Sequence, residues 1–125
     1  MLVAIDIGNT NITVGIFNKD TFVANYRMTT KVRRTSDEFG FMLNTFLTRS
    51  NVTKENIEAI IVSSVVPKVM YSFVNGIRKF YGIEPIIVGP GIKTGISIQL
   101  ENPKSVGADR IADAAGAYYT YGGPV

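Results

Sequence analysis

Two short segments of this chain carry the side chains that could do chemistry. The first, DIGNTNIT, covers residues 6–13 and follows an apolar run, which places the Asp6 carboxylate where a buried strand ends. A buried carboxylate needs solvent, a partner or a metal, because burying the charge alone is costly. Gly8 leaves space beside the backbone, and successive N–H groups of such a turn can form an anion-binding concavity. The segment predicts a phosphate-binding turn, with an ordinary hairpin turn as the alternative.

Magnesium fits this first segment as a partner of the carboxylate. Mg²⁺ prefers oxygen ligands, and Asp6 would hold the ion or its waters against the phosphates. The neighbouring residues Asn9, Thr10 and Asn11 add amide and hydroxyl groups to the same turn.

The second segment, NPKSVGADRIADAAGAYY, covers residues 102–119. Asp109 and Arg110 stand near the start of a predicted helix, where the helix dipole favours an aspartate and disfavours an arginine. The arginine therefore indicates a guanidinium that binds a carboxylate or a phosphate through its fork of donors. Asp113 lies on the same helical face as Asp109 and is predicted to orient or to repel rather than to catalyse. A capped helix with incidental charges is the alternative.

The composition limits the chemistry that is available. There is no cysteine and no histidine, so disulfides, thiol nucleophiles, the usual zinc sites and imidazole bases are excluded. A general base must then be a carboxylate, a lysine or a tyrosine. GPGIKTG, at residues 89–95, fails as a Walker phosphate loop because Ile92 stands where a glycine should precede Lys93.

The formal charge is +3, from 13 basic and 10 acidic residues. The densest basic stretch contains Lys31, Arg33 and Arg34, with Arg27 nearby. It reads as a solvated loop or, as the second interpretation, a rim that attracts phosphate. The excess is too small and too scattered to indicate nucleic-acid binding. Neither a membrane span nor the basic start of a signal peptide is present, so we expect a cytoplasmic protein without a membrane partner.

The elements that must position the two segments follow from hydrophobic periodicity. Strands are predicted at residues 2–7, 11–17 and 21–28, joined by short connections as an antiparallel meander. Thr35 and Glu38 have the spacing of a capping box before a helical stripe that runs to Leu47. Further elements are a strand at 57–66, a helix from Pro67 that ends at Gly82, a strand at 85–88, a short β piece at 96–100 and a helix at 108–121.

The predicted order is βββαβαβα in one compact domain of 125 residues. The later strands join the first three through helices by parallel crossovers. The expected fold class is α/β, with a mixed five-stranded sheet and helices packed on it.

The chain resembles a known superfamily at these points. DIGNTNIT looks like the first phosphate motif of the actin, sugar-kinase and Hsp70 type of ATPase, and the element order is similar to the N-terminal, ribonuclease H-like domain of that fold. Within it, Asn9, the GADR sequence at 107–110 after an Asn-Pro pair, and SSVVP at 63–67 resemble type III pantothenate kinases, also called the Bvg accessory factor family.

That resemblance implies a kinase that moves the γ-phosphate of ATP to pantothenate, the first step of coenzyme A synthesis. It implies that Asp109 is the general base, a role that suits a carboxylate facing a primary hydroxyl. Family members are similar in being homodimers and in using a monovalent cation, K⁺ or NH₄⁺. The implied ATP-binding residues are Asp6 (also the Mg²⁺ ligand), Ile7, Gly8, Asn9, Thr10, Asn11, Ile12 and Thr13, and the implied pantothenate-binding residues are Gly107, Ala108, Asp109 and Arg110.

The chain departs from the family pattern at Leu100, where a tyrosine is frequent, which puts a substrate contact there in doubt. The resemblance also implies a second domain with a second phosphate motif and the cation ligand. Residues 1–125 are then the N-terminal domain and are expected to be inactive alone. Two alternative functions are a non-enzymatic transcriptional accessory factor and another actin-like ATPase, such as a polyphosphatase or a chaperone. Against the transcriptional role, the sequence shows no helix-turn-helix pattern. Against another actin-like ATPase, that function would not explain the GADR sequence.

Overall fold

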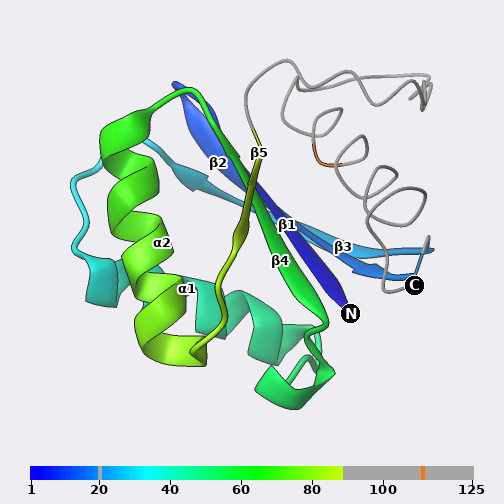
Figure 1. The fold of residues 1–125 in the computed structure, drawn as a ribbon. Coiled ribbons are helices and arrows are strands. Elements are labelled where there is room, and N and C mark those ends of the chain that lie inside the picture. Colours follow the sequence, from blue (N-terminus) through cyan, green and yellow to red (C-terminus); the bar gives the residue numbers. More distant parts are fainter. Residues whose placement is uncertain (20, 89–110, 112–125) are drawn as a thin grey trace, which may run out of the picture.

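A computed structural model describes residues 1–19, 21–88 and 111 of the chain. Its elements follow the predicted order up to the fifth strand (Figure 1). They are β1 (Leu2–Ile7), β2 (Asn11–Asn18), β3 (Thr21–Thr29), α1 (Ser36–Arg49), a 3-10 turn (Lys54–Asn56), β4 (Ala59–Ser64), α2 (Pro67–Tyr81) and β5 (Ile86–Val88). The predicted β piece at 96–100 and the predicted helix at 108–121 lie outside the described residues, except for Ile111, which is helical.

The five strands form one mixed sheet in the order β3-β2-β1-β4-β5. β1 pairs antiparallel with β2, and β2 pairs antiparallel with β3, which confirms the meander. β4 lies parallel to β1 on its other side, and β5 lies parallel to β4. The prediction of a mixed sheet with parallel crossovers is therefore confirmed. β1 is the central strand, and all six of its residues are buried.

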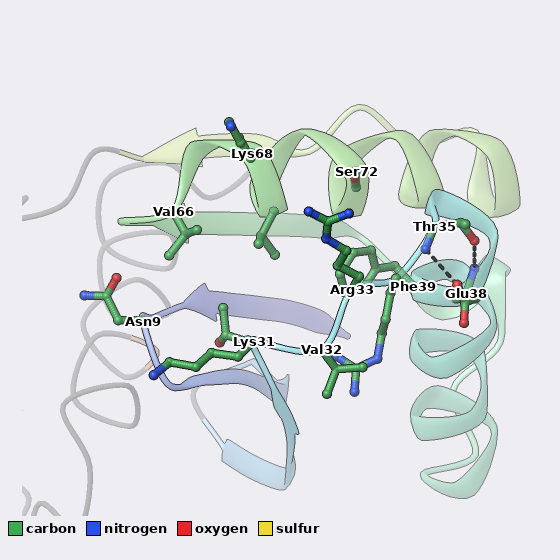
Figure 2. A pocket seen from close by; sticks show the side chains of 13 residues that line it. Asn9, Lys31, Val32, Arg33, Thr35, Glu38, Phe39, Val66, Lys68 and Ser72 are labelled. Atoms are coloured by element: carbon green, nitrogen blue, oxygen red, sulfur yellow. Dashed lines mark hydrogen bonds between the residues drawn. The ribbon is translucent and has the colours of Figure 1, made fainter.

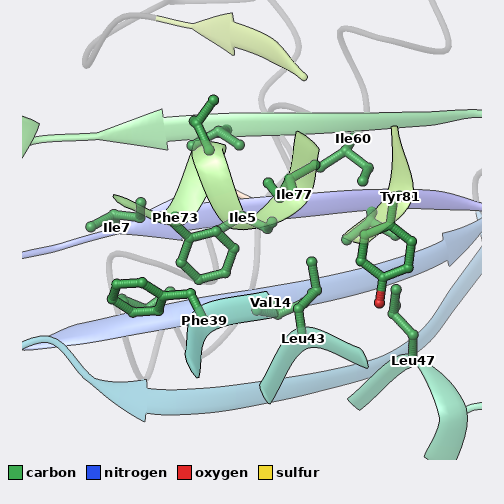
Figure 3. Packing of buried hydrophobic residues seen from close by; sticks show 14 of the residues in the cluster. Ile5, Ile7, Val14, Phe39, Leu43, Leu47, Ile60, Phe73, Ile77 and Tyr81 are labelled. Atoms are coloured by element: carbon green, nitrogen blue, oxygen red, sulfur yellow. The ribbon is translucent and has the colours of Figure 1, made fainter. Parts of the chain in front are cut away.

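Helices α1 and α2 cover one face of this sheet (Figure 1). The core between the helices and the sheet contains Ile5, Ile7 and Val14 from the strands, together with the predicted apolar stripes of α1 and α2 (Figure 3). Phe39 and Phe73 meet there with ring centroids 5.0 Å apart. This core leaves the opposite face of the sheet to carry the polar residues described below.

The predicted helix boundaries are confirmed by their caps. The Thr35 hydroxyl accepts a hydrogen bond from the Glu38 N–H at 3.1 Å, and the Thr35 N–H donates to the Glu38 carboxylate at 2.9 Å. These two bonds satisfy groups that the first turn of a helix otherwise leaves unpaired. α2 begins with Pro67 in its first turn and ends at Gly82, which has a left-handed backbone with φ of 63°.

Some boundaries differ from the prediction. β4 begins at Ala59 rather than at residue 57, because Ile57 closes the 3-10 turn by donating to the Lys54 carbonyl at 3.2 Å. The segment 6–13 spans the connection between the first two predicted strands, and the structure confirms this place. Asp6 and Ile7 belong to β1, and residues 11–13 belong to β2, so that Gly8, Asn9 and Thr10 alone form the connection.

The second face of the sheet carries a smaller apolar cluster, made of Leu2, Ala4, Phe17, Ala59, Ile61 and Ile111. Ile111, the one described residue of the last predicted helix, is 3% exposed in this cluster. Among the described residues, we find no helix with the length and apolar character needed to cross a membrane.

Candidate functional site

The connection between β1 and β2 is a tight turn from Gly8 to Asn11. The Gly8 N–H donates to the Asn11 carbonyl at 3.0 Å, directly after the Ile7–Ile12 strand pair. A Cβ on Gly8 would lie 3.2 Å from that carbonyl oxygen, so the turn has little room for a side chain there. Asn9 and Thr10 are exposed. Their amide, hydroxyl and backbone groups are therefore accessible to a ligand.

Thr30, directly after β3, holds this turn in place. Its hydroxyl donates to the Gly8 carbonyl at 2.8 Å, and its N–H donates to the Thr10 carbonyl at 2.9 Å. Thr30 is 6% exposed, so both bonds are shielded from water. The turn is consequently fixed by a residue that lies outside the segment that the sequence singled out.

Asp6 lies in a row of polar residues that crosses the centre of the sheet. It is directly opposite Thr13 of β2 and Ser63 of β4, and all three are buried. Directly opposed residues in neighbouring strands have Cβ atoms about 5 Å apart and point to the same face. Because Asp6 alternates with Val3, Ile5 and Ile7 in the helix-covered core, the row lies on the opposite face, beside Ala4 and Ile61.

The chemistry of this row fits a magnesium ion that retains most of its waters. Mg²⁺ in nucleotide sites is typically held by one or two carboxylates together with the phosphates of the substrate. Asp6 supplies one carboxylate, and the hydroxyls of Thr13 and Ser63 are its neighbours across the strands. Within residues 1–19, 21–88 and 111 there is no group of three or more acidic side chains that could hold a metal ion.

The other half of the predicted site, Gly107, Ala108, Asp109 and Arg110, lies outside the described residues. Whether Asp109 shares a cleft with Asp6 stays a prediction. The neighbouring Ile111 is described, and it packs on the face of the sheet that carries Asp6.

A groove opens beside the Gly8–Asn11 turn and has a volume of about 610 Å³. Its walls come from Asn9, from the loop at residues 30–35 and from the first turns of α1 and α2 (Figure 2). The basic stretch singled out in the sequence supplies Lys31, Arg33 and Arg34 to this groove, whereas Arg27 does not line it.

Sequence reasoning missed two residues of this region. Ser63 was noted only as part of the SSVVP resemblance, and its place beside Asp6 depends on the pairing of β1 with β4. Thr30 carries no local signal, because one threonine at the end of a strand is ordinary. Only knowledge of which strands are neighbours could have identified either of them.

The arrangement of the strands and helices is shared with proteins of known structure. The structure is similar to a putative N-acetylglucosamine kinase from Porphyromonas gingivalis, with a TM-score of 0.50 and 14% identity over 71% of this chain and 34% of that one. It is also similar to RuvC of T. thermophilus, with a TM-score of 0.59 and 15% identity over 94% of this chain and 92% of that one. At such identities the likeness concerns the fold, which is the ribonuclease H-like fold shared by actin-like ATPases, as predicted.

The sequence comparisons are more specific. The family pattern of type III pantothenate kinases matches residues 2–125. Proteins named type III pantothenate kinase from Bifidobacterium longum subsp. infantis and Agathobacter rectalis are 57% and 54% identical to this chain over all 125 residues. The chain belongs to the type III pantothenate kinase family. It spans about half the length of these relatives, 49% and 48% respectively.

Proposed function

We propose that the protein containing this chain transfers the γ-phosphoryl group of ATP to the 4′-hydroxyl of pantothenate, the first step of coenzyme A synthesis. The family membership supports this activity. The observation that carries it is the place of Asp6, buried near the carboxyl end of the central strand and followed directly by the Gly8–Asn11 turn. Ligands of open α/β sheets bind at such strand ends.

In this proposal the segment from Asp6 to Thr13 binds the nucleotide phosphates. The exposed groups of Asn9 and Thr10 contact them, and Gly8 lets the backbone approach. Asp6 holds Mg²⁺ or its waters, with Thr13 and Ser63 beside it. When bound, the ion neutralises charge on the phosphate oxygens.

Gly107, Ala108 and Arg110 bind pantothenate, and Asp109 acts as the general base. The hydroxyl oxygen of pantothenate attacks the γ-phosphorus, the bond to the β–γ bridging oxygen breaks, and ADP leaves. The hydroxyl proton passes to the Asp109 carboxylate. The contact of Ile111, two residues further along the chain, with the sheet face that carries Asp6 supports this arrangement.

The proposal includes features of the whole protein. We infer a second domain that supplies a second phosphate motif and the ligand of a monovalent cation, K⁺ or NH₄⁺. A homodimer and a cytoplasmic location also belong to the proposal. With the second phosphate motif in another domain, residues 1–125 alone would bind phosphate weakly and would not turn over, since closure of a second domain over the nucleotide is needed.

The experiment uses the full-length protein and measures pantothenate-dependent ADP release with Mg²⁺ and K⁺ or NH₄⁺. Asp109→Asn should lower turnover by about 100-fold or more with the fold intact. Asp6→Asn should raise the Mg²⁺ concentration needed for half-maximal rate. Asp37→Asn is the matched control, because Asp37 is an exposed partner of Lys79 on the surface. Unchanged turnover in Asp109→Asn would remove this residue from the mechanism, and ADP release without pantothenate would favour an ATPase.

A further inference from the structure

The groove beside the Gly8–Asn11 turn lies outside the set of residues to which the proposed function assigns a role. Four segments line it: the turn itself at Asn9, the loop at residues 30–35, the start of α1 at Glu38 and Phe39, and the start of α2 at residues 66–72. Its volume of about 610 Å³ is within the range of sites that hold small ligands. It borders the proposed phosphate-binding turn but contains neither Asp6 nor Gly8 among its walls.

The charges on its walls are predominantly positive. Lys31, Arg33, Arg34 and Lys68 line the groove, and Glu38 is the single carboxylate among its lining residues. Glu38 already accepts the Thr35 N–H in the capping box. Arg34 donates to the Thr29 carbonyl. Across the described ranges 1–19, 21–88 and 111, no carboxylate forms an ion pair with Lys31, Arg33 or Lys68.

The two loop cations reach different ends of the groove. In Figure 2 the Lys31 side chain extends toward the side where Asn9 lies, and the Arg33 guanidinium lies under α2 near Ser72. Positive side chains that converge on a concave wall raise the local concentration of anions. The helix dipole gives the N-terminus of α2 a partial positive charge that adds to the same field. No acidic residue in the first turn of α2 offsets it.

The loop that carries these cations is fixed to the proposed nucleotide-binding turn. Thr30, directly before Lys31, makes the two buried hydrogen bonds to the Gly8 and Thr10 carbonyls. At its other end the loop is held by the capping box of α1 at Thr35. Both ends of the loop that carries Lys31 and Arg33 are consequently fixed relative to the turn and to α1.

We propose that this groove is a binding subsite for a phosphate group, held by Lys31 and Arg33. The phosphate belongs to the nucleotide or to the phosphorylated product, and this identity of the ligand rests on the proposed kinase function. The capacity to bind a phosphate oxyanion rests on the groove alone. Arg33 offers the forked donors that suit phosphate oxygens, and Lys31 offers a point charge beside the Asn9 turn.

The test measures binding to the full-length protein by calorimetry, with ADP, 4′-phosphopantothenate, inorganic phosphate and adenosine as separate ligands. Lys31→Gln combined with Arg33→Gln should weaken at least one phosphate-bearing ligand by about tenfold or more, since two charge-assisted contacts are lost. Adenosine has no phosphate and should bind equally to both proteins. A loss for ADP alone assigns the subsite to the nucleotide, and a loss for 4′-phosphopantothenate alone assigns it to the product.

Lys54→Gln is the matched control, because Lys54 is exposed in the 3-10 turn and does not line the groove. The proposal is overturned if the double variant keeps a wild-type melting temperature and binds all three phosphate-bearing ligands within about twofold of wild type. Equal weakening of adenosine also overturns it. If the double variant does not fold, the same binding measurements are made on Lys31→Gln and Arg33→Gln separately and judged by the same criteria. Because binding is measured and not turnover, a failure of Asp109 as base leaves this result untouched.

Discussion

Gly15 of β2 lies directly against Ile111: a Cβ added to Gly15 would stand 2.5 Å from Cγ2 of Ile111. A real Cβ does not approach another carbon so closely, so this glycine is what lets the isoleucine settle on the sheet. Ile111 is buried among Leu2, Ala4 and Ile61 on the face that also carries Asp6. One glycine thus determines how closely Ile111 can approach the sheet.

Replacement of Gly15 should therefore destabilise the fold through overpacking. We expect Gly15→Ala to lower the free energy of unfolding by about 1–3 kcal/mol, measured by urea unfolding of the full-length protein. Ile111→Ala removes the γ carbons, so the Gly15→Ala cost should largely disappear in that background. Ile111→Val keeps Cγ2 and serves as the control that gives no relief. Strictly additive effects of Gly15→Ala and Ile111→Ala would show that the contact does not exist.

Thr30 should act as a positioning residue for the Gly8–Asn11 turn. Thr30→Val keeps the shape of the side chain and removes the hydroxyl that donates to the Gly8 carbonyl at 2.8 Å. A buried hydrogen bond of this kind contributes about 1 kcal/mol, and its loss lets the turn adopt other conformations. We expect the KM for ATP to rise about threefold to tenfold, with a smaller change in kcat.

Thr30→Ser restores the hydroxyl and is the matched rescue for Thr30→Val. Steady-state kinetics of both variants, with melting temperatures recorded in parallel, separate positioning from general stability. An equal loss of kcat and of thermal stability in both variants, with KM unchanged, would contradict the positioning role.

The contact between the two helices depends on Gly76 of α2. A Cβ at this position would lie 2.5 Å from the backbone oxygen of Ser36 and 3.1 Å from the backbone nitrogen of Gly40. Backbone atoms cannot rotate away, so the helices must separate. Gly76→Ala should therefore destabilise by about 2–3 kcal/mol, although alanine favours an isolated helix by about 1 kcal/mol.

Asn75→Ala is the control for that substitution, because Asn75 is the exposed neighbour on the same helix. It should leave the urea midpoint unchanged or raise it slightly. A stabilising effect of Gly76→Ala would mean that α1 and α2 pack less closely than described.

Tyr81 should make stability depend on pH in the alkaline range. Burial raises the pKa of the Tyr81 phenol from 10.0 to about 12, and its hydroxyl donates to the Asn44 side chain at 3.1 Å. Between these two pKa values the folded protein keeps a proton that the unfolded chain has lost. The contribution is therefore complete below pH 10 and is lost as pH rises toward 12.

The expected slope from this residue is a decrease of about 1.4 kcal/mol per pH unit over that window. Tyr81→Phe removes the ionisable group and should flatten the pH dependence by this amount, at the cost of the bond to Asn44. Urea unfolding of both proteins at pH 8 to 11 measures the difference. Parallel curves for wild type and Tyr81→Phe would show that Tyr81 does not titrate with a raised pKa.

Much of the fold could be predicted because its signals are local. The capping box of Thr35 and Glu38, Pro67 at the start of α2 and Gly82 at its end each act within a few residues of their own position. The alternation around Ile12 and Val14 and the continuous apolar run of β1 likewise depend on neighbouring residues. These patterns, with DIGNTNIT at 6–13, determined the element order and the segment proposed to bind phosphate.

The tertiary structure decided which distant residues complete the site. Ser63 lies beside Asp6 because β4 pairs with β1, Thr30 reaches the Gly8 carbonyl because β3 ends beside the turn, and Ile111 packs where Gly15 makes room. Each of these contacts joins residues far apart in the chain, and its geometry follows from burying both faces of one sheet at once. A hydroxyl residue or a lysine carries no local mark of such a neighbour. The sequence alone therefore left open whether the basic loop was merely solvated, and the groove that it lines emerged only from the packed fold.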